Sequence, residues 1–456
     1  MSKNTRFEVN LSEGSVAGQL IRFSLPFLIS NLIQSLYAVA DMIIVGRFSD
    51  INNMSGVHIG NQATFLITNA VIGLCVGGTV LIGQYLGSGK KQELKETIST
   101  LFSTLLVLSV VISVVMLLLR EPFLNMLKTP AESFSQAKSY LTITLSGTLF
   151  IFGYNALSAV MRGMGDSRNP LKFVAIACFT NIALDLLLVA VFDMGAQGAA
   201  LATVISQGLS MILCIIYLKK NRFVFDFSLS SFRFNGERLK MLFKIGAPTL
   251  FNSVAVSTSF LFLTGFANNI GLIASTAVGV VGRFNAFAIL PAIAMGSAIS
   301  AMCAQNFGAG KPERAVKTMK IGLLISISIS YSIFILTQLF PEELLKIFNS
   351  DPQLIQAGAA YLRPFSFDYI FVPLLFCLNG LFIGSGHTAF SFINGMLSSL
   401  IIRIPVAYIF GIVLDKGLAG IGLGAPFASG LAFVSALLFY FSGRWRKQVI
   451  IKNKEL

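Results

Sequence analysis

Apolar residues in this 456-residue chain fall in long continuous runs, without the alternation of a half-buried strand or the mixed faces of a surface helix. A run of about 20 residues crosses a hydrocarbon core of about 30 Å as a helix that rises 1.5 Å per residue. The pattern therefore predicts an all-α, polytopic membrane protein with 12 transmembrane helices. They lie near residues 16–46, 55–86, 97–119, 136–161, 169–192, 196–218, 241–266, 272–304, 318–340, 354–382, 388–412 and 418–442.

Composition supports a membrane protein and excludes a disordered chain or an ordinary soluble enzyme. Only 12% of the residues are charged, where a soluble domain has about 25%, and the mean hydropathy is +0.77. The net charge of +14 comes from 34 Lys and Arg against 20 Asp and Glu. These charges lie in short gaps between apolar runs and form no basic stripe, so we expect no nucleic-acid partner.

The positive residues also predict the orientation. An even number of spans puts both termini on one side of the membrane. If that side is cytoplasmic, 25 of the 34 Lys and Arg lie inside, as the positive-inside rule requires. We therefore expect an integral protein of the cytoplasmic (inner) membrane of a prokaryote, with both termini cytoplasmic, in contact with membrane lipid and acting as a monomer.

The chain divides into two similar halves: an N-lobe (1–218) and a C-lobe (241–456), joined by a polar linker (219–240). Motifs repeat at an offset of about 221 residues. Gln84–Lys90 corresponds to Gln305–Lys311, Gly163-Met-Gly165 to Gly384-Ser-Gly386, Tyr140 to Tyr361, Pro26 to Pro248, and Asp193 to Asp415. Each half has six spans, so the copies point the same way, and two such pseudo-symmetric lobes enclose a central cleft in alternating-access carriers.

Three acids lie inside spans, where a carboxylate costs roughly 2.5–3.5 kcal/mol on insertion scales: Asp41, Asp185 and Asp368. Counting from the inner side, Asp41 and Asp185 both fall in the outer half of the bilayer, so they can share one pocket. Tyr37 and Asn181 lie one turn away on the same helix faces. Two neighbouring carboxylates disfavour double ionisation and so favour binding of a proton or another cation. The alternative is that these acids serve helix packing alone.

Other residues within spans carry weaker signals. Asp368 is flanked by Phe365 and Phe371, and we expect these three residues and Asp41 to line a substrate cleft. Pro26 can bend the first helix and is a candidate conformational hinge. Arg283 and Arg403 are expected to be partners of buried polar groups and receive no transport role.

In combination and order, several motifs resemble the multidrug and toxic-compound extrusion (MATE) family across almost the whole chain. The motifs are Asp41-Met-Ile-Ile-Val-Gly46, Gln84-Tyr-Leu-Gly-Ser-Gly89, Met161–Pro170, and Asn181-Ile-Ala-Leu-Asp185 followed by Gly195–Ala200. The resemblance implies a V-shaped pair of six-helix lobes that exports cationic or amphipathic drugs in exchange for protons or sodium ions.

Within that family, the acids resemble those of the DinF-type branch. This likeness implies a cation-binding pocket of Tyr37, Asp41, Asn155, Asn181, Asp185 and Thr203. The chain departs from the NorM-type branch, whose acids lie in the C-lobe, because the span from Pro248 to Phe266 holds no acid. Proton coupling in the N-lobe is thereby favoured, although Asp41, Asp185 and Asn181 also offer the hard oxygen ligands that Na⁺ accepts.

The sequence therefore predicts a secondary active multidrug efflux antiporter that works by alternating access. We expect no enzyme activity, no cofactor and no structural metal, with H⁺ or Na⁺ as the coupling ion. The alternative function is a flippase for a lipid-linked precursor. A flippase needs several basic side chains facing the cleft for a pyrophosphate, and only Arg283 and Arg403 are candidates.

Overall fold

The computed structural model describes residues 9–221, 223–447 and 449–451, and within these ranges the chain is helical without a β-strand. Five of the 25 positive residues counted above lie outside them: Lys3, Arg6, Arg222, Lys452 and Lys454. The elements of the first half are α1 (Val16–Phe48), α2 (Ile51–Gly87), α3 (Lys91–Met126), α4 (Ala131–Ser146), α5 (Thr148–Gly163), α6 (Arg168–Asp185), η1 (Leu186–Val191), α7 (Gly195–Lys220) and η2 (Leu229–Ser231).

The second half contains a matching series. Its elements are α8 (Gly236–Ile270), α9 (Leu272–Ala288), α10 (Leu290–Gly308), α11 (Pro312–Leu339), α12 (Pro341–Lys346), α13 (Pro352–Phe365), α14 (Asp368–Gly384), α15 (Thr388–Met396), η3 (Leu397–Arg403), α16 (Ile404–Tyr408), η4 (Ile409–Val413), α17 (Gly417–Gly422), α18 (Gly424–Phe441) and η5 (Arg444–Arg446). The segments η1, η3 and η4 are π-helical turns that continue neighbouring α-helices.

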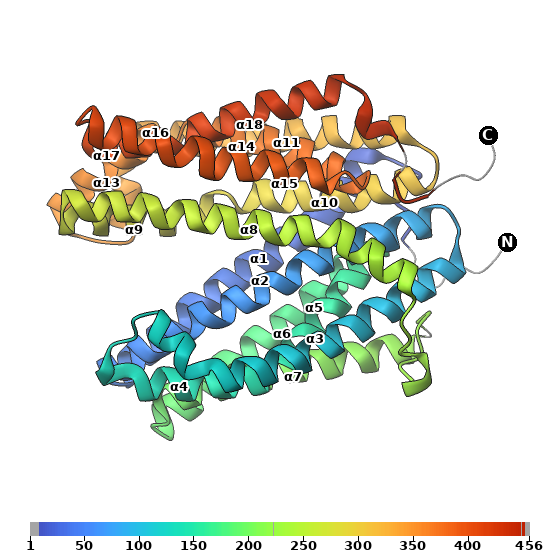
Figure 1. Cartoon of the computed structure of the whole chain (residues 1–456), viewed down its shortest axis with the longest axis horizontal. Coiled ribbons are helices and arrows are strands. Elements are labelled where there is room, and N and C mark those ends of the chain that lie inside the picture. The colour runs from blue at the N-terminus through green and yellow to red at the C-terminus, as the bar shows by residue number, and fades with distance from the viewer. Residues whose placement is uncertain (1–8, 222, 448, 452–456) are drawn as a thin grey trace. The chain divides into compact units, whose positions relative to one another are not determined.

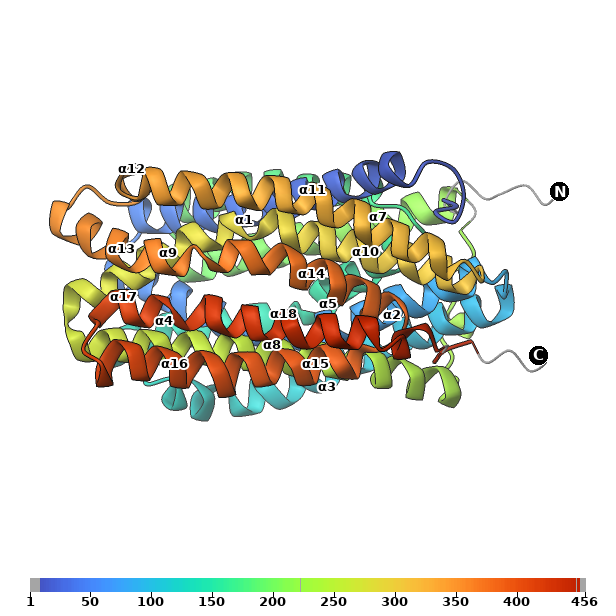
Figure 2. The same cartoon turned by 90° about the horizontal axis from the view of Figure 1, so that it is seen from above.

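The expected all-helical membrane fold is confirmed. Within the described ranges, nine helices are long and apolar enough to cross a membrane, and three bent helix pairs raise the number to twelve. Each of the twelve overlaps one of the runs counted in the sequence. Long helices within each half run side by side, as α14, α15 and α18 do in Figure 2.

Two of the bent pairs occupy equivalent places in the repeat. Helices α4 and α5 meet at 51°, and helices α13 and α14 meet at 47°. The first bend lies at Gly147, where a Cβ atom would come within 2.4 Å of the Val204 side chain of α7. The second bend comes just before Asp368, the residue 221 positions after Gly147. The duplication thus extends to the shape of individual spans.

The repeated Gly-x-Gly motif has a packing explanation. A Cβ atom on Gly163 would lie 2.8 Å from the Thr79 carbonyl oxygen of α2, and one on Gly384 would lie 2.7 Å from the Ser300 carbonyl oxygen of α10. Two residues later, Gly165 and Gly386 adopt φ values of 87° and 93°, in the left-handed region that glycine tolerates. Each motif therefore ends a helix that crosses its neighbour closely.

Packing divides the chain into two units whose boundaries differ from the linear ones at 218 and 241. The first unit is Ile29–Gly246 with Val9 and Asn10, and the second is Leu11–Leu28 with Ala247–Leu456. Helix α1 starts in the second unit because Leu20 and Phe23 are buried there against Ile299 and Met302. Polar contacts add to this anchoring: Leu11 N–H donates to Gln305, Lys311 donates to the Ser12 carbonyl, and Arg314 donates to the Glu13 and Gly14 carbonyls.

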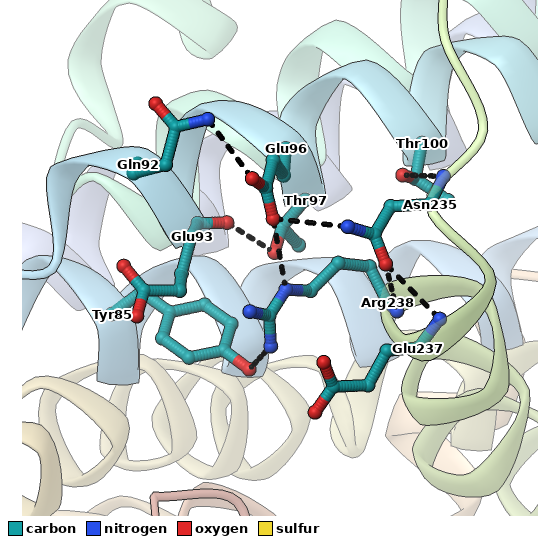
Figure 3. A network of polar contacts seen from close by, with 9 residues as sticks. All are labelled: Tyr85, Gln92, Glu93, Glu96, Thr97, Thr100, Asn235, Glu237 and Arg238. Atoms are coloured by element: carbon teal, nitrogen blue, oxygen red, sulfur yellow. Dashed lines mark hydrogen bonds and ion pairs between the residues drawn. The ribbon is translucent and has the colours of Figure 1, made fainter.

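Helix α8 is also divided between the two units: its first turns, up to Gly246, belong to the first unit, and the rest belongs to the second. Asn235 caps α8, its Oδ1 accepting from the N–H groups of Glu237 and Arg238 at 3.0 and 3.2 Å. The Arg238 guanidinium donates to Tyr85 Oη at 2.8 Å and pairs with Glu96 of α3 at 3.5 Å, as Figure 3 shows. Asn235 also donates to the Glu96 carboxylate at 3.1 Å. This network fixes the start of α8 to α2 and α3.

The linker before α8 also packs onto the first unit (Figure 1). Phe225 is buried and meets the ring of Phe102 on α3 edge to face, with ring centres 5.2 Å apart. The Ser99 hydroxyl donates to the Ser231 carbonyl at 2.6 Å and accepts from the Arg233 N–H at 2.9 Å. Hydrogen bonds from Ser231 and Ser228 lower the pKa of Asp226 to about 2, so this carboxylate stays ionised and holds its turn.

Replacing the first glycine of either Gly-x-Gly motif should destabilise the protein. Gly163→Ala or Gly384→Ala places a methyl group against a backbone oxygen, and overpacking of this kind costs about 1–3 kcal/mol. The midpoint of thermal unfolding in detergent measures the loss. Gly279→Ala in α9 is the matched control, because no atom lies within 4 Å of the added Cβ. An equal loss in the control would contradict the packing explanation.

Arg238→Ala should also lower stability, by about 1–3 kcal/mol, because it removes the donor to the buried Tyr85 hydroxyl and the cationic partner of the Glu96 carboxylate. The same unfolding measurement applies. Arg233→Ala is the comparison, because the exposed Arg233 side chain bonds one backbone carbonyl, that of Ser230. The anchoring role is wrong if both variants unfold at the wild-type temperature.

Candidate functional site

A buried polar cluster lies within the first unit, where α1 and α6 bring two acids together. Asp41 is 3% exposed and Asp185 is fully buried. Asp185 is the last residue of α6, directly before the π-helical turn η1. Turns of this kind occur mainly at functional sites, because they re-aim side chains within a helix.

The two acids share their surroundings with one amide and two hydroxyls. With the Asn181 amide oriented so that donors meet acceptors, its Nδ2 donates to Asp185 Oδ2 at 2.8 Å and its Oδ1 accepts from the Thr203 N–H at 3.2 Å. The Tyr37 hydroxyl lies 3.5 Å from Thr203 Oγ1. The structure therefore groups Tyr37, Asp41, Asn181, Asp185 and Thr203, which are five of the six residues expected for the cation pocket.

The side chains of Asp41 and Asp185 lie close enough for a hydrogen bond between their carboxyl groups. An ionised carboxylate has no donor, so this bond requires a proton on one of the two groups. Besides burial and the Asn181 amide, the interactions that act on the pair come from the two acids themselves, and no Lys or Arg of the described ranges contributes. The buried pair can therefore hold one proton between its two carboxyl groups, and the Oδ1 atom of each acid has no hydrogen-bond partner.

A small cavity opens beside this cluster, wholly within the first unit. Its volume of about 30 Å³ holds one or two water molecules. The walls include Gln34, Tyr37, Tyr154, Cys178, Asn181 and Gln207. Tyr37 and Asn181 belong to both the cavity and the acid cluster, so the cavity borders the carboxyl pair.

Two residues complete the description of this cluster. Asn155, the sixth expected residue, turns its amide to its own helix and donates to the Ile151 carbonyl at 2.8 Å. Tyr140 of α4 was not expected here, yet it is buried, hydrogen-bonds Thr203 and interacts electrostatically with Asp41. Its match to Tyr361 in the repeat is the one feature of the sequence that could have pointed to it.

The remaining candidates lie in other parts of the chain. Asp368 is 5% exposed in the second unit, Phe365 is buried against Tyr361 and Tyr369, and Phe371 is partly buried. Pro26 lies inside the continuous helix α1, three residues before Ile29, where the helix passes into the first unit. Their roles in substrate binding and bending stay predictions. Within the described ranges no group of three or more His, Cys, Asp or Glu side chains forms a metal cluster.

A duplicated bundle of long apolar helices, with two acids enclosed at the membrane-spanning positions of one copy, defines a polytopic membrane transporter. The sequence model of the MatE family matches residues 26–187 and, 222 residues later, 248–409. The chain belongs to the MatE family. It is therefore a transporter rather than an enzyme, and the two matches coincide with the two repeats.

Bacterial relatives match the chain over nearly its full length. The probable multidrug resistance protein YpnP of Bacillus subtilis is 28% identical over 445 residues, covering 98% of this chain and 99% of its own length. The probable multidrug resistance protein NorM of Thermotoga maritima is 27% identical, covering 96% and 95%. The multidrug export protein MepA of Staphylococcus aureus is 24% identical, covering 94% of each chain.

Solved structures show the same fold. An outward-facing multidrug resistance MATE family transporter superposes with a TM-score of 0.91 at 23% identity, covering 98% of this chain and all of that chain. A MATE structure in the straight conformation gives a TM-score of 0.89 at 23% identity, covering 97% of this chain and 98% of that chain.

Asp41→Asn should leave the fold intact, because the amide can donate to Asp185 in place of the shared proton. We expect its stability to stay within about 1 kcal/mol of wild type, whereas Asp41→Ala removes the partner of a buried carboxyl and costs about 1–3 kcal/mol more. Thermal unfolding in detergent compares the two variants. Equal stability of the Asn and Ala variants would show that the carboxyl pair is not hydrogen-bonded.

Proposed function

We propose that this chain exports cationic or amphipathic small molecules across the cytoplasmic membrane in exchange for protons, by alternating access. The observation that carries the proposal is the close pair of buried acids, Asp41 and Asp185, which is free of basic partners in the described ranges. The names of the relatives, which describe multidrug resistance and export proteins, support the class of substrate.

The carboxyl pair can couple two ligands because its charge depends on how many protons it holds. Loss of the shared proton leaves two adjacent carboxylates, which attract a cationic substrate. Uptake of protons from outside neutralises the pair and weakens that attraction, so the substrate leaves. Coupling of this kind is reciprocal, and each ligand lowers the affinity of the other by about 5–150-fold.

Sodium ions are the second candidate for the coupling ion. The free Oδ1 atoms of Asp41 and Asp185 and the amide oxygen of Asn181 are hard ligands of the kind that Na⁺ accepts. Protons are favoured, because two carboxyl groups close enough for a hydrogen bond can share one. The flippase alternative has less support, since the cavity next to the acids includes no Lys or Arg among its lining residues.

We further propose that both termini face the cytoplasm and that the monomer is the working unit. The proposal for orientation rests on the positive residues of the sequence, of which 25 of 34 lie on the side of the termini. A substrate of drug size does not fit the 30 Å³ cavity as it stands, so substrate entry requires side chains or helices next to it to move.

Transport into proteoliposomes tests the proposal. Uptake of a fluorescent cationic drug is measured with an outward-directed gradient of either protons or Na⁺, each imposed separately. The proton gradient, with the vesicle interior acidic, should drive uptake. In the wild type, drug affinity should fall as the pH falls, by about 5–150-fold across the titration. Asp41→Asn should weaken the dependence of drug affinity on pH, because one of the two titrating carboxyl groups is removed.

The matched control is Asp193→Asn. Asp193 is an exposed acid of the same unit with φ of 52°, a conformation that Asn also tolerates, and its replacement should leave pH-dependent transport unchanged. Wild-type coupling in the folded Asp41→Asn protein would refute the assignment. Uptake driven by Na⁺ alone would replace the proton by sodium as the coupling ion.

A further inference from the structure

The second unit contains a buried charged cluster that the proposed mechanism does not use. Asp368 begins α14 at the 47° bend, is 5% exposed, and hydrogen-bonds Ser429 of α18. Its Oδ1 atom is buried without a hydrogen-bond partner. A lone carboxylate in this place would be a second cation site, because buried acids in a membrane bind protons, cations or basic side chains.

A basic side chain of the same unit faces this carboxylate. Arg403, 7% exposed, interacts electrostatically with Asp368 and Tyr361. Its Nη1 donates to Ser259 Oγ at 3.1 Å, and its guanidinium lies 4.8 Å from the centre of the Phe260 ring. The Nε atom is buried without a partner. The guanidinium therefore contacts α8 directly, and its positive charge also acts on Asp368.

The repeat places this cluster at the counterpart of the cation pocket. The two family matches begin 222 residues apart. At that offset Ser259 corresponds to Tyr37, Arg403 to Asn181, and Ser429 to Gln207. The first-unit residues line the water-sized cavity. Where the first unit has an amide beside its acids, the second unit therefore has a guanidinium beside its acid.

We propose that Arg403 is the resident cation of the second unit, meaning a fixed positive charge that takes the place of an exchangeable ion. Ion coupling is thereby restricted to the first unit. Arg stays protonated at all physiological pH values, so its charge cannot leave during transport. The two side chains form no direct salt bridge, and the charge of Arg403 instead balances an ionised Asp368 through space, so that the second-unit site is neutral overall. No proton or Na⁺ needs to bind there. This inference rests on cation coupling at Asp41 and Asp185, and it assigns Asp368 a different role from the substrate contact expected from the sequence.

The first test is a double-mutant cycle in thermal unfolding of the purified full-length protein. Asp368→Asn and Arg403→Gln each leave one buried charge unpaired and should each lower the unfolding midpoint. The double variant should lose less than the sum of the two, because both charges are removed together. Arg283→Gln is the matched control, since Arg283 is an exposed arginine of α9 and should add to Asp368→Asn without coupling. Additive losses for Asp368 and Arg403 would overturn the proposal.

The second test counts ions. In proteoliposomes the reversal potential gives the ratio of cations to drug, which should be unchanged in Asp368→Asn. In Arg403→Gln, Asp368 loses its resident cation, so the ratio should rise by one and Na⁺ should raise the unfolding midpoint more than in wild type. Adding Asp368→Asn to Arg403→Gln should abolish this extra response to Na⁺. If Arg403→Gln does not fold, Arg403→Lys and the double variant still decide, because both should keep the wild-type ratio.

The outcomes separate this inference from the proposed function. A changed cation ratio in Asp368→Asn would make Asp368 a coupling residue and overturn the inference while coupling at Asp41 stands. Weaker drug binding by Asp368→Asn at an unchanged ratio would make it a substrate contact and also overturn the inference. Wild-type coupling in Asp41→Asn would instead refute the proposed function, whatever the second-unit variants do.

Discussion

The first unit is organised around the hydrogen bond between the carboxyl groups of Asp41 and Asp185. Two carboxylates buried at this depth repel each other and lose their hydration, so the site is stable only with a proton or another cation between them. Helices α1, α4, α6 and α7 each supply a group that holds the pair or its neighbours: Tyr37, Tyr140, Asn181 and Thr203. This requirement for a bound cation is the basis of the coupling role proposed for the cluster.

Helix α1 contains residues of both units, so the acid site of the first unit is connected to the second unit through this helix. Asp41 is on α1, whose first turns pack in the second unit, while Asp41 itself packs in the first. Helix α8 repeats the arrangement in the other direction, with Arg238 fixing its start to the first unit. A change in charge at Asp41 therefore acts on a helix that belongs to both units. Pro26 lies close to the point where α1 passes from one unit to the other.

Run length and residue spacing predicted a large part of this structure. Twelve spans followed from apolar runs, because only a helix satisfies its backbone within lipid. The helical spacing of Tyr37 and Asp41, and of Asn181 and Asp185, predicted that each pair shares a face, and the repeat predicted the matched glycines. The resemblance added Thr203, which contacts Tyr37.

Other features depend on packing between distant segments and had no local signal. The bend at Gly147 arises from crowding by Val204 of another helix, and the transfer of Leu11–Leu28 to the second unit arises from a core formed with α10 and α11. Tyr140 was difficult to assign because a tyrosine in an apolar run is equally suited to packing. Arg403 was expected to be a partner of buried polar groups, but its correspondence to Asn181 emerged only once its contacts were known.

In our proposal the two halves neutralise their buried acids in different ways: the first unit uses an exchangeable cation, and the second uses the fixed charge of Arg403. A transporter with an exchangeable cation in both lobes needs two occupancy changes for each cycle, and any mismatch between them permits leak. If one lobe contains a fixed pair of charges, its electrostatic energy is the same at every step, and only the other lobe responds to the ion gradient. In such a duplicated fold, one copy binds and releases the coupling ion while the charge of the other copy stays constant. The second-unit positions that correspond to Asp41 and Asp185 hold no acid, which is consistent with this division.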